Sequence, residues 1–342
     1  MNIVVLAGGI STERDVSLTS GKNIVKALKQ AGENAQLLDL FLGFRGSVDE
    51  FFSGDGRIDT VSAIGLVDPS IEEIKAARGD EGDGLFGPNV LEICKKADIV
   101  FLGLHGEDGE NGKVQATFDT LKIKYTGTGC LGSAMAMNKY ISKQIMNANG
   151  IKNAAYAYVK KGEPVPECTG PCVIKPASGG SSVGVSIVLD EADYQKAVDF
   201  AFKYEDEIII EQYLKGREFS VGILGDTVLP PIEIIPKEGF YDYANKYQPG
   251  MTIEICPAEL SEEETKDVQL QTKRVCDALG MAVYARADFI LNEADGEFYC
   301  LEVNSLPGMT DMSLLPQEAK AIGIDYPDLC MKIIELSLKK DA

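Results

Sequence analysis

The first hundred residues alternate between continuous apolar runs and a segment with helical spacing. Residues 3–9, IVVLAGG, are apolar up to two glycines, and Ala97–Gly106, ADIVFLGLHG, form a second apolar run. Such runs are typical of strands that are buried on both faces of a parallel sheet. Between them, apolar residues recur at helical spacing from residue 16 to residue 28, and Gly32 follows as a stop signal. The alternation predicts an open α/β sheet.

The pattern changes after about Tyr125. Residues 130–150 have the apolar spacing of one long helix that ends at Gly150. Residues 172–188 predict a strand, a glycine-rich loop and a second strand, and a helix capped by Asp190 is expected to follow. Together these elements predict a small α+β unit.

The last third of the chain predicts several more strands and one polar loop. Residues 236–260 are rich in Gly, Pro and Tyr, which predicts a long ordered loop of the kind that often forms a lid. A helix is expected over residues 262–279, followed by two strands joined by a turn at Asn292–Gly296. Residues 43–89 are expected to be mostly loops, with a short helix near Ile71–Ala77, and we assign them no role.

Composition limits the classes of function. The chain has 342 residues, which suggests two or three domains, and a net charge of −20. Because a surface this acidic repels phosphate backbones, we expect no nucleic-acid partner. The sequence has no run of 18 apolar residues, which argues against a membrane span. Its N-terminus is expected to form a first strand rather than a signal peptide.

The cysteine and histidine counts argue against a zinc site. The chain has eight cysteines, of which only two are close in sequence, and His105 is its single histidine. Scattered cysteines in a chain of this size are typical of reduced thiols in a cytosolic protein. We therefore expect a cytoplasmic protein that binds small molecules.

Four polar residues lie on two neighbouring predicted strands. Arg286 and Asp288 are two residues apart and share one face, and the same holds for Glu302 and Asn304 on the next strand. A hairpin pairing can bring the four together. Two carboxylates and an amide oxygen would then form a site suited to Mg²⁺ bound with nucleotide phosphates. The alternation alone fits a polar, solvent-exposed sheet face equally well.

Lys175 precedes the glycine-rich loop of VIKPASGGSSVG instead of following it. Gly179, Gly184 and Ser186 fit the frame of a P-loop, but the lysine position of that motif holds Val185. A hairpin loop with free N–H groups can also bind an anion, and a lysine on the strand below it can reach phosphate oxygens. The alternative is a solvated lysine at a strand end.

Polar residues at the ends of the N-terminal strands are a third candidate. Gly8 and Gly9 lack the G-x-G-x-x-G spacing of a dinucleotide site. Glu13 follows the first strand and His105 lies at the end of the second, where an open α/β sheet places ligand groups. A lone histidine is more often structural, although glycines and three carboxylates surround His105 in the sequence.

In this order, the motifs resemble those of the D-alanine–D-alanine ligases of the ATP-grasp superfamily, over essentially the whole chain. The similar segments are GGISTERDVSLTSG, LHGEDGENG, YTGTGCLGSAMAMNK, VIKPASGGSSVG, FYDYANKY, and RADF with EVNSLPGMTDMSLLP. The resemblance implies an ATP-grasp fold, α/β and α+β, whose N-terminal domain contains an open parallel sheet. The three implied domains are an N-terminal α/β domain (1–127), a central lid domain (128–210) and a C-terminal domain (211–342) with an ω-loop (237–257).

The resemblance also implies a reaction. ATP would phosphorylate the carboxylate of one D-alanine, and the amine of a second would attack the acylphosphate to give D-alanyl-D-alanine for peptidoglycan. The implied cofactors are ATP and two Mg²⁺ ions, for which Mn²⁺ is expected to substitute. A homodimer is expected by analogy alone.

Nucleotide and metal residues follow from the same resemblance. Phosphate contacts are expected from Lys139, Lys175, Ser182 and Lys246. Adenine and ribose contacts are expected from Glu211, Gln212, Leu214 and Glu218. The expected metal ligands are Asp288, Glu302 and Asn304.

Substrate and catalytic residues are implied as well. Glu13 would bind the ammonium of the first D-alanine, His105 would lie near its carboxylate, and Arg286 would stabilise the charge of the tetrahedral intermediate. The ω-loop would be tied over the site by a hydrogen-bonded bridge of Glu13, Ser181 and Tyr247. The second D-alanine would be held by Gly308, Ser313 and Leu314.

Three alternatives stay open. A D-alanine–D-serine ligase or another amino-acid ligase belongs to the same superfamily, but the apolar Leu314 and the pair Lys246–Tyr247 favour D-alanine as the acceptor. A nicotinamide dehydrogenase would need the glycine spacing that the chain lacks. A non-catalytic nucleotide-binding module would be expected to have lost metal ligands that this sequence retains.

Overall fold

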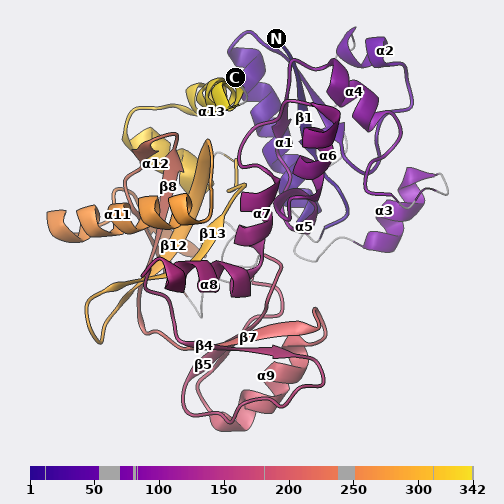
Figure 1. Cartoon of the computed structure of the whole chain (residues 1–342). Coiled ribbons are helices and arrows are strands. Elements are labelled where there is room, and N and C mark those ends of the chain that lie inside the picture. Colours follow the sequence, from indigo (N-terminus) through magenta and orange to yellow (C-terminus); the bar gives the residue numbers. More distant parts are fainter. Residues whose placement is uncertain are drawn as a thin grey trace.

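The computed structural model describes residues 1–11, 13–53, 70–79, 82, 84–180, 182–237, 251–310 and 312–340. Three sheets follow one another along the chain, in its N-terminal, middle and C-terminal parts (Figure 1). This mixture of helices and sheets agrees with the predicted α/β and α+β class. The domain boundaries after residues 127 and 210 stay a prediction.

The first sheet is parallel, and its central strand is buried from Ile3 to Ala7. β1 (Asn2–Ala7) lies between β2 (Asn34–Asp39) and β3 (Ile99–Leu102), and no side chain from Ile3 to Ala7 is exposed. This confirms the predicted parallel sheet, although β3 is shorter than the predicted run because residues 103–106 leave the sheet as a loop. The helices of this part are α1 (Arg14–Gln30), α2 (Val48–Ser53), α3 (Ile71–Arg78), α4 (Val90–Lys96), α5 (Glu107–Glu110) and α6 (Lys113–Leu121).

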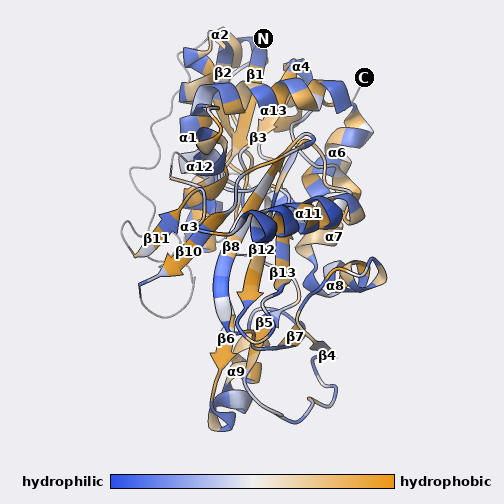
Figure 2. Cartoon of the chain, turned by 90° about the vertical axis from the view of Figure 1, so that its left-hand side faces the viewer, coloured by the Kyte–Doolittle hydropathy of each residue, from blue (hydrophilic) through white to orange (hydrophobic). Residues whose placement is uncertain are grey.

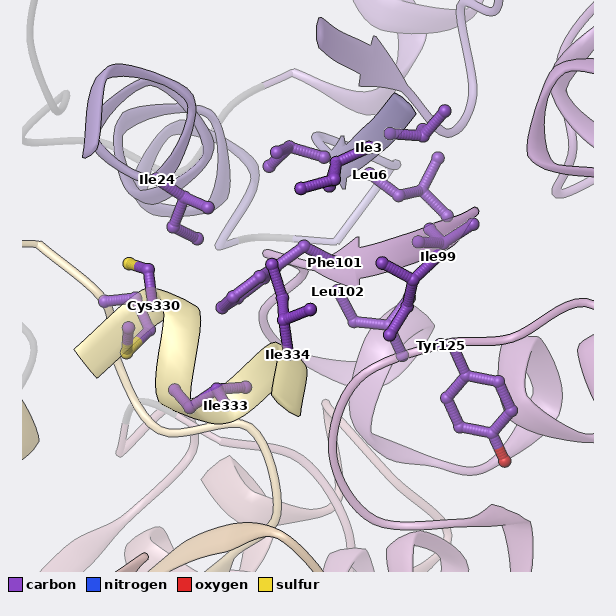
Figure 3. Close-up of a cluster of buried hydrophobic side chains, with 14 of the residues drawn as sticks. Ile3, Leu6, Ile24, Ile99, Phe101, Leu102, Tyr125, Cys330, Ile333 and Ile334 are labelled. Atoms are coloured by element: carbon purple, nitrogen blue, oxygen red, sulfur yellow. The ribbon is translucent and has the colours of Figure 1, made fainter. Parts of the chain in front are cut away.

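The last helix of the chain completes the core of the first sheet. α13 (Tyr326–Lys340) packs against α1, and its Ile333 and Ile334 share a buried cluster with Ile3 and Phe101 (Figure 3). The two termini accordingly lie on the same side of the molecule (Figure 1). The C-terminal part is thereby fixed to the N-terminal sheet through apolar contacts.

The second sheet is antiparallel and has the strand order β4-β7-β5-β6. Asp190 accepts a hydrogen bond from the Ala192 N–H, as predicted for a cap, but the first turn is a 3-10 helix and the α-helix begins only at Tyr194. This helix, α9, packs on β5 and β6. The elements are β4 (Tyr156–Lys160), β5 (Cys172–Pro176), β6 (Ser186–Val188), η1 (Glu191–Asp193), α9 (Tyr194–Ala201) and β7 (Glu207–Gln212).

The single helix predicted over residues 130–150 is wrong. The segment forms α7 (Cys130–Met137) and α8 (Lys139–Ala148), which are separated by Asn138 in an extended conformation with φ −91° and ψ 105°. The Asn138 side chain accepts a hydrogen bond from the Ile141 N–H and thereby caps α8. Apolar spacing continues across the break, so the spacing could not reveal it.

The third sheet has the order β11-β10-β8-β12-β13, with β9 beside β8. α11 covers one face, with a capping box of Ser261 and Glu264 at its start, and its hydrophilic outer surface faces the viewer in Figure 2. The predicted helix over residues 262–279 and the turn at Asn292–Gly296 are confirmed. The elements are β8 (Gly216–Leu224), β9 (Thr227–Val228), β10 (Ile232–Pro236), β11 (Thr252–Ile255), α11 (Glu262–Ala278), β12 (Tyr284–Asn292), β13 (Phe298–Asn304) and α12 (Leu314–Ala321).

The cysteines and the helices give two further observations. All eight cysteines are free, as predicted for reduced thiols. Within the described ranges, no helix has both the length and the apolar composition that crossing a membrane requires.

The break at Asn138 gives a stability prediction. We expect Asn138→Ala to lower the free energy of unfolding by about 1 kcal/mol, because the Ile141 N–H loses its acceptor. Asn138→Asp keeps a side-chain acceptor and should cost clearly less. Urea unfolding followed by circular dichroism measures both variants. Equal losses in the two variants would show that the cap does not stabilise α8.

Candidate active site

A cavity separates the second sheet from the third. Its walls come from β5, the β5–β6 loop and β7 on one side, and from β8, β12 and β13 on the other. Val173, Ile187, Ile290 and Leu301 add apolar surface to these walls. An apolar wall beside charged groups suits a nucleotide, whose base has apolar faces and whose phosphates are charged. The predicted nucleotide and metal residues that line the cavity are Lys139, Lys175, Ser182, Glu211, Gln212, Leu214, Glu218, Asp288 and Glu302.

The glycine-rich loop is the tip of a hairpin. β5 and β6 pair antiparallel, with Val173 opposite Ile187, and no helix begins at Gly184 in this described segment. Gly179 and Gly184 have φ angles of 89° and 74°, which residues with side chains rarely adopt. Lys175 therefore extends from the strand below the loop. This confirms the hairpin interpretation and excludes a P-loop.

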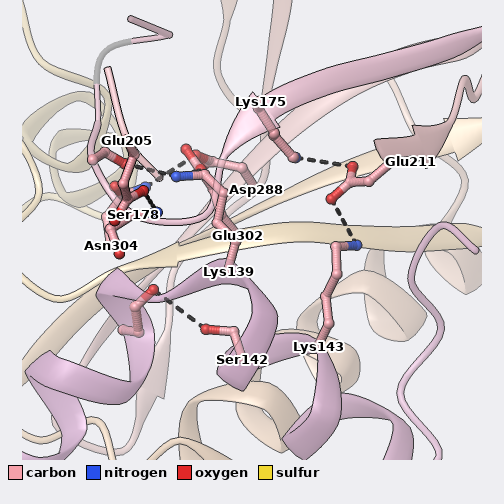
Figure 4. Close-up of polar contacts among 12 residues, drawn as sticks. Lys139, Ser142, Lys143, Lys175, Ser178, Glu205, Glu211, Asp288, Glu302 and Asn304 are labelled. Carbon is pink, nitrogen blue, oxygen red and sulfur yellow. Dashed lines mark hydrogen bonds and ion pairs between the residues drawn. The ribbon is translucent and has the colours of Figure 1, made fainter. Parts of the chain in front are cut away.

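Three hydrogen bonds fix the start of the hairpin loop. The Ser178 N–H donates to Glu205 Oε2 at 2.6 Å, and Lys139 Nζ donates to the Gly179 carbonyl at 2.6 Å (Figure 4). The Lys139 N–H also donates to the Ala177 carbonyl at 2.7 Å. The last contact is possible because α8 starts at Lys139. The first backbone N–H groups of a helix have no hydrogen-bond partner within that helix. Sequence reasoning missed Glu205, which gave no local signal.

Glu211 is buried between two lysines at the back of the cavity. Its Oε2 lies 2.9 Å from Lys175 Nζ, and its Oε1 lies 3.1 Å from Lys143 Nζ (Figure 4). Burial alone raises the pKa of the Glu211 carboxyl, but the two ammonium groups outweigh it and the pKa is lowered. Glu211 is therefore a carboxylate at neutral pH. Sequence reasoning missed Lys143, although it follows Lys139 by four residues and so lies on the same helix face.

Asp288 is the centre of a second polar cluster. In the β12–β13 register Arg286 lies opposite Asn304, and Asp288 lies opposite Glu302. Asp288 accepts hydrogen bonds from Arg286 Nε at 2.9 Å, Arg286 Nη2 at 2.8 Å and Asn304 Nδ2 at 3.1 Å. Ser220 Oγ on β8, which sequence reasoning missed, donates at 2.7 Å. The four predicted residues do meet, and an exposure of 7% excludes a solvent-exposed sheet face at Asp288.

The cluster suits a hard divalent cation. Asp288, Glu302 and Asn304 bring carboxylate and amide oxygens together from two adjacent strands. Each Asp288 oxygen accepts two hydrogen bonds in this structure, so a metal that binds Asp288 would replace at least one of these donors. Lys139 Nζ lies 4.0 Å from Glu302 Oε2, so phosphates bound beside this pair would contact both a cation and the metal site.

Glu13 connects the first sheet to the hairpin loop. It lies directly before α1 and is 7% exposed. A Cβ on Gly106 would lie 2.9 Å from Glu13 Oε2, and a Cβ on Gly180 would lie 3.0 Å from the same atom. Both glycines therefore allow a close approach to Glu13. The carboxylate lies where the N-terminal loops meet the loop of the second sheet.

His105 is buried beside Glu13's loop. Its Nε2 lies 2.9 Å from Ser20 Oγ, and the side chain is 6% exposed. The pKa of the imidazole is lowered to about 4: burial lowers it most, the backbone hydrogen bond with Leu306 raises it, and the charge of Arg286 lowers it. The imidazole is therefore neutral at physiological pH.

The predicted acceptor residues lie at the start of α12. A Cβ on Gly308 would lie 2.8 Å from Ser313 Oγ, so these two residues are in close contact. Ser313 Oγ accepts from the Thr310 N–H at 2.9 Å and contacts its hydroxyl at 2.8 Å. Leu314 packs in a buried cluster with Ile232 and Ile234. The predicted residues that lie outside the described ranges are Ser181, Lys246 and Tyr247.

Known proteins resemble the chain over its full length. The family model “D-ala D-ala ligase N-terminus” matches residues 2–128, and “D-ala D-ala ligase C-terminus” matches residues 145–335. The D-alanine–D-alanine ligase of Pediococcus pentosaceus is 47% identical, over 98% of this chain and 97% of that protein. The enzyme of the same name from Lacticaseibacillus casei is 44% identical, over 99% of this chain and 96% of that protein.

Solved structures agree with this match. The crystal structure of D-alanine–D-alanine ligase from Bacillus anthracis has a TM-score of 0.77 and 32% identity, with 100% of both chains covered. The structure of that enzyme complexed with ATP has a TM-score of 0.75 and 29% identity, over 100% of this chain and 99% of that chain. The predicted fold is thereby confirmed, and the chain belongs to the D-alanine–D-alanine ligase family.

Proposed function

We propose that this chain is an ATP-dependent ligase that joins two D-alanines into D-alanyl-D-alanine for peptidoglycan synthesis, with release of ADP and phosphate. The observation that carries the proposal is the cavity between two sheets, with lysines on one wall and an oxygen-donor cluster on the other. Near full-length relatives at 47% and 44% identity are named D-alanine–D-alanine ligase, which favours D-alanine over D-serine as the acceptor.

The cavity suggests how ATP is held. We infer that the base lies between the apolar walls, beside Glu211 and the backbone of Gln212 and Leu214, with the ribose near Glu218. The phosphates would then lie under the hairpin loop, within reach of Lys139, Lys175 and Ser182. Such positioning and charge neutralisation supply most of the catalysis in phosphoryl transfer. Lys246, outside the described ranges, is proposed to approach the γ-phosphate.

The oxygen cluster suggests where metal binds. Asp288, Glu302 and Asn304 would hold two Mg²⁺ ions, for which Mn²⁺ would substitute. Mg²⁺ bound there would neutralise charge on the β- and γ-phosphates. Ser220 keeps Asp288 in a fixed orientation towards this position.

The first D-alanine is proposed to lie between Glu13 and Arg286. Glu13 would bind its ammonium group, and the neutral His105 would lie near its carboxylate. That carboxylate oxygen attacks the γ-phosphorus, and ADP leaves. Arg286, at 14% side-chain exposure, would stabilise negative charge as the intermediate forms. Glu13 lies close to Gly180, and this close approach leaves little room for water, which would otherwise hydrolyse the acylphosphate.

The second D-alanine is proposed to bind at the start of α12. Its amine attacks the acyl carbon, the tetrahedral intermediate expels phosphate, and the amine loses a proton. Gly308 and Ser313 would contact the acceptor, and Leu314 would shape the apolar side of its site. Ser181 and Tyr247, both outside the described ranges, are proposed to close the ω-loop with Glu13.

We further propose a three-domain organisation with boundaries at residues 127 and 210, a cytoplasmic location and a homodimer. The three sheets support the domain division. The location and the homodimer rest on family analogy.

The activity is tested by ADP release with D-alanine as the only amino acid, followed by mass spectrometry of the product. We expect D-alanyl-D-alanine, and slower ADP release when D-serine or D-lactate is offered as the acceptor. A higher kcat/KM for D-serine than for D-alanine would contradict the proposed acceptor.

The metal assignment is tested by Glu302→Gln. We expect Mg²⁺-dependent ADP release to fall about 100-fold, because a carboxylate ligand is lost. Glu297→Gln is the matched control, since Glu297 lies just before the same strand and pairs at the surface with Lys152. The control should stay near wild-type activity. Full activity of Glu302→Gln would refute the assignment.

The neutral imidazole gives a pH prediction. Because His105 is the single histidine, its NMR signals identify it directly, and we expect them to stay constant from pH 8 to pH 5 and to titrate near pH 4. In the urea-unfolded chain, the imidazole of His105 should titrate with a pKa of about 6.5. Since only the unfolded chain binds this proton between those values, stability should fall as the pH drops from about 6.5 to 4. A folded-state midpoint near 6.5 would contradict the burial argument.

A further inference from the structure

Lys143 is a buried cation behind the cavity, and the mechanism above does not use it. It lies on α8 with a side-chain exposure of 1%. Its Nζ lies 3.1 Å from Glu211 Oε1, 3.4 Å from Asn153 Oδ1 and 5.3 Å from the centre of the Tyr156 ring. Asn153 is itself held by Asn147, to which it donates at 2.8 Å. These contacts fix the ammonium group in one place.

Lys143 reaches the cavity only through Glu211. Among the described residues, Glu211 lines the cavity and Lys143 does not. The lysine's three partners are a carboxylate, an amide oxygen and an aromatic face, all of which stabilise a cation. Any effect of Lys143 on a bound nucleotide must therefore pass through the Glu211 carboxylate.

The two lysines on Glu211 differ in what they can do. Lys175 lines the cavity and contacts Oε2, whereas Lys143 lies behind the wall and contacts Oε1. If Lys175 turns towards phosphates, as we infer from the proposed function, Glu211 loses this contact on Oε2. A buried carboxylate without a cation is strongly disfavoured, so a second, permanent partner is needed. Lys143 is placed to be that partner.

We propose that Lys143 is a positioning residue for base recognition: it holds Glu211 in place through Oε1, so that Oε2 accepts a hydrogen bond from the adenine amino group after Lys175 turns to the phosphates. This inference rests on the proposed function. Lys175 Nζ contacts the same Oε2 at 2.9 Å, so nucleotide binding would exchange one donor on Oε2 for another.

The same geometry determines which base fits. Adenine presents an amino donor at its 6-position, whereas guanine presents a carbonyl acceptor there. A fixed carboxylate oxygen accepts a hydrogen bond from the amino group of adenine and repels the carbonyl of guanine. Because guanine would leave buried polar groups unpaired, the discrimination between the two bases is large. Loss of Lys143 should therefore reduce selectivity for ATP over GTP and not only affinity.

The test is Lys143→Met, assayed by steady-state ADP or GDP release with D-alanine. We expect the KM for ATP to rise at least ~10-fold, the value of one charge-assisted hydrogen bond. The preference for ATP over GTP should fall, while kcat and the KM for D-alanine stay within about twofold of wild type. Lys143→Arg keeps a cation and should recover part of the loss. Lys152→Met, at a lysine with 48% exposure, is the matched control and should change nothing.

A double-mutant cycle with Glu211→Gln decides whether Lys143 acts through Glu211. We expect Lys143→Met to have little further effect on the KM for ATP in the Glu211→Gln background. Independent, additive effects would overturn the proposal, and so would an unchanged KM in the single variant. If Lys143→Met does not fold, Lys143→Gln is used in the same cycle, with the same expectations.

The outcomes separate this inference from the proposed function. Wild-type protein that releases no ADP with D-alanine would refute the proposed function itself. Active wild-type protein whose Lys143 variants keep normal ATP affinity and base selectivity would refute only the role of Lys143.

Discussion

The burial of charged side chains between two sheets is the constraint on which this site depends. Lys175 and Glu211 lie on the second sheet, and Asp288 and Glu302 lie on the third. A buried charge is tolerated only beside an opposite charge or several hydrogen bonds. In the described structure Glu211 contacts two lysines and Asp288 accepts four hydrogen bonds, so each buried carboxylate has polar partners inside the protein.

This constraint explains why the site is built from both sheets. The lysines offer cations to phosphates, and the carboxylates offer oxygens to metal, but neither set alone neutralises a nucleotide with its metal. The N-terminal sheet adds Glu13, which reaches Gly180 of the hairpin loop. The first sheet is in turn fixed to the C-terminal part by α13. The three parts therefore meet where the proposed phosphoryl transfer takes place.

The sequence predicted what depends on local pattern. Continuous apolar runs predicted the parallel sheet. Asp288 and Glu302 are each two residues from another polar residue, Arg286 and Asn304, and this spacing predicted that each pair shares one face of its strand. It could not predict contacts set by packing. The break at Asn138 leaves apolar spacing unchanged, and the sequence does not show that Lys143 of α8 contacts Glu211 of β7. Ser220 and Glu205 likewise gain their roles only from strand register and loop packing. The expected roles of Ser181, Lys246 and Tyr247 stay predictions.

The proposed site is tested most directly by a crystal structure with Mg²⁺ and a non-hydrolysable ATP analogue. We expect that Lys175 Nζ has moved from Glu211 to the phosphates, that Glu211 Oε2 accepts from the adenine amino group, and that Lys143 still contacts Oε1. We also expect metal density at Asp288, Glu302 and Asn304. A base bound away from Glu211, with the Lys175–Glu211 ion pair intact, would contradict the proposed site.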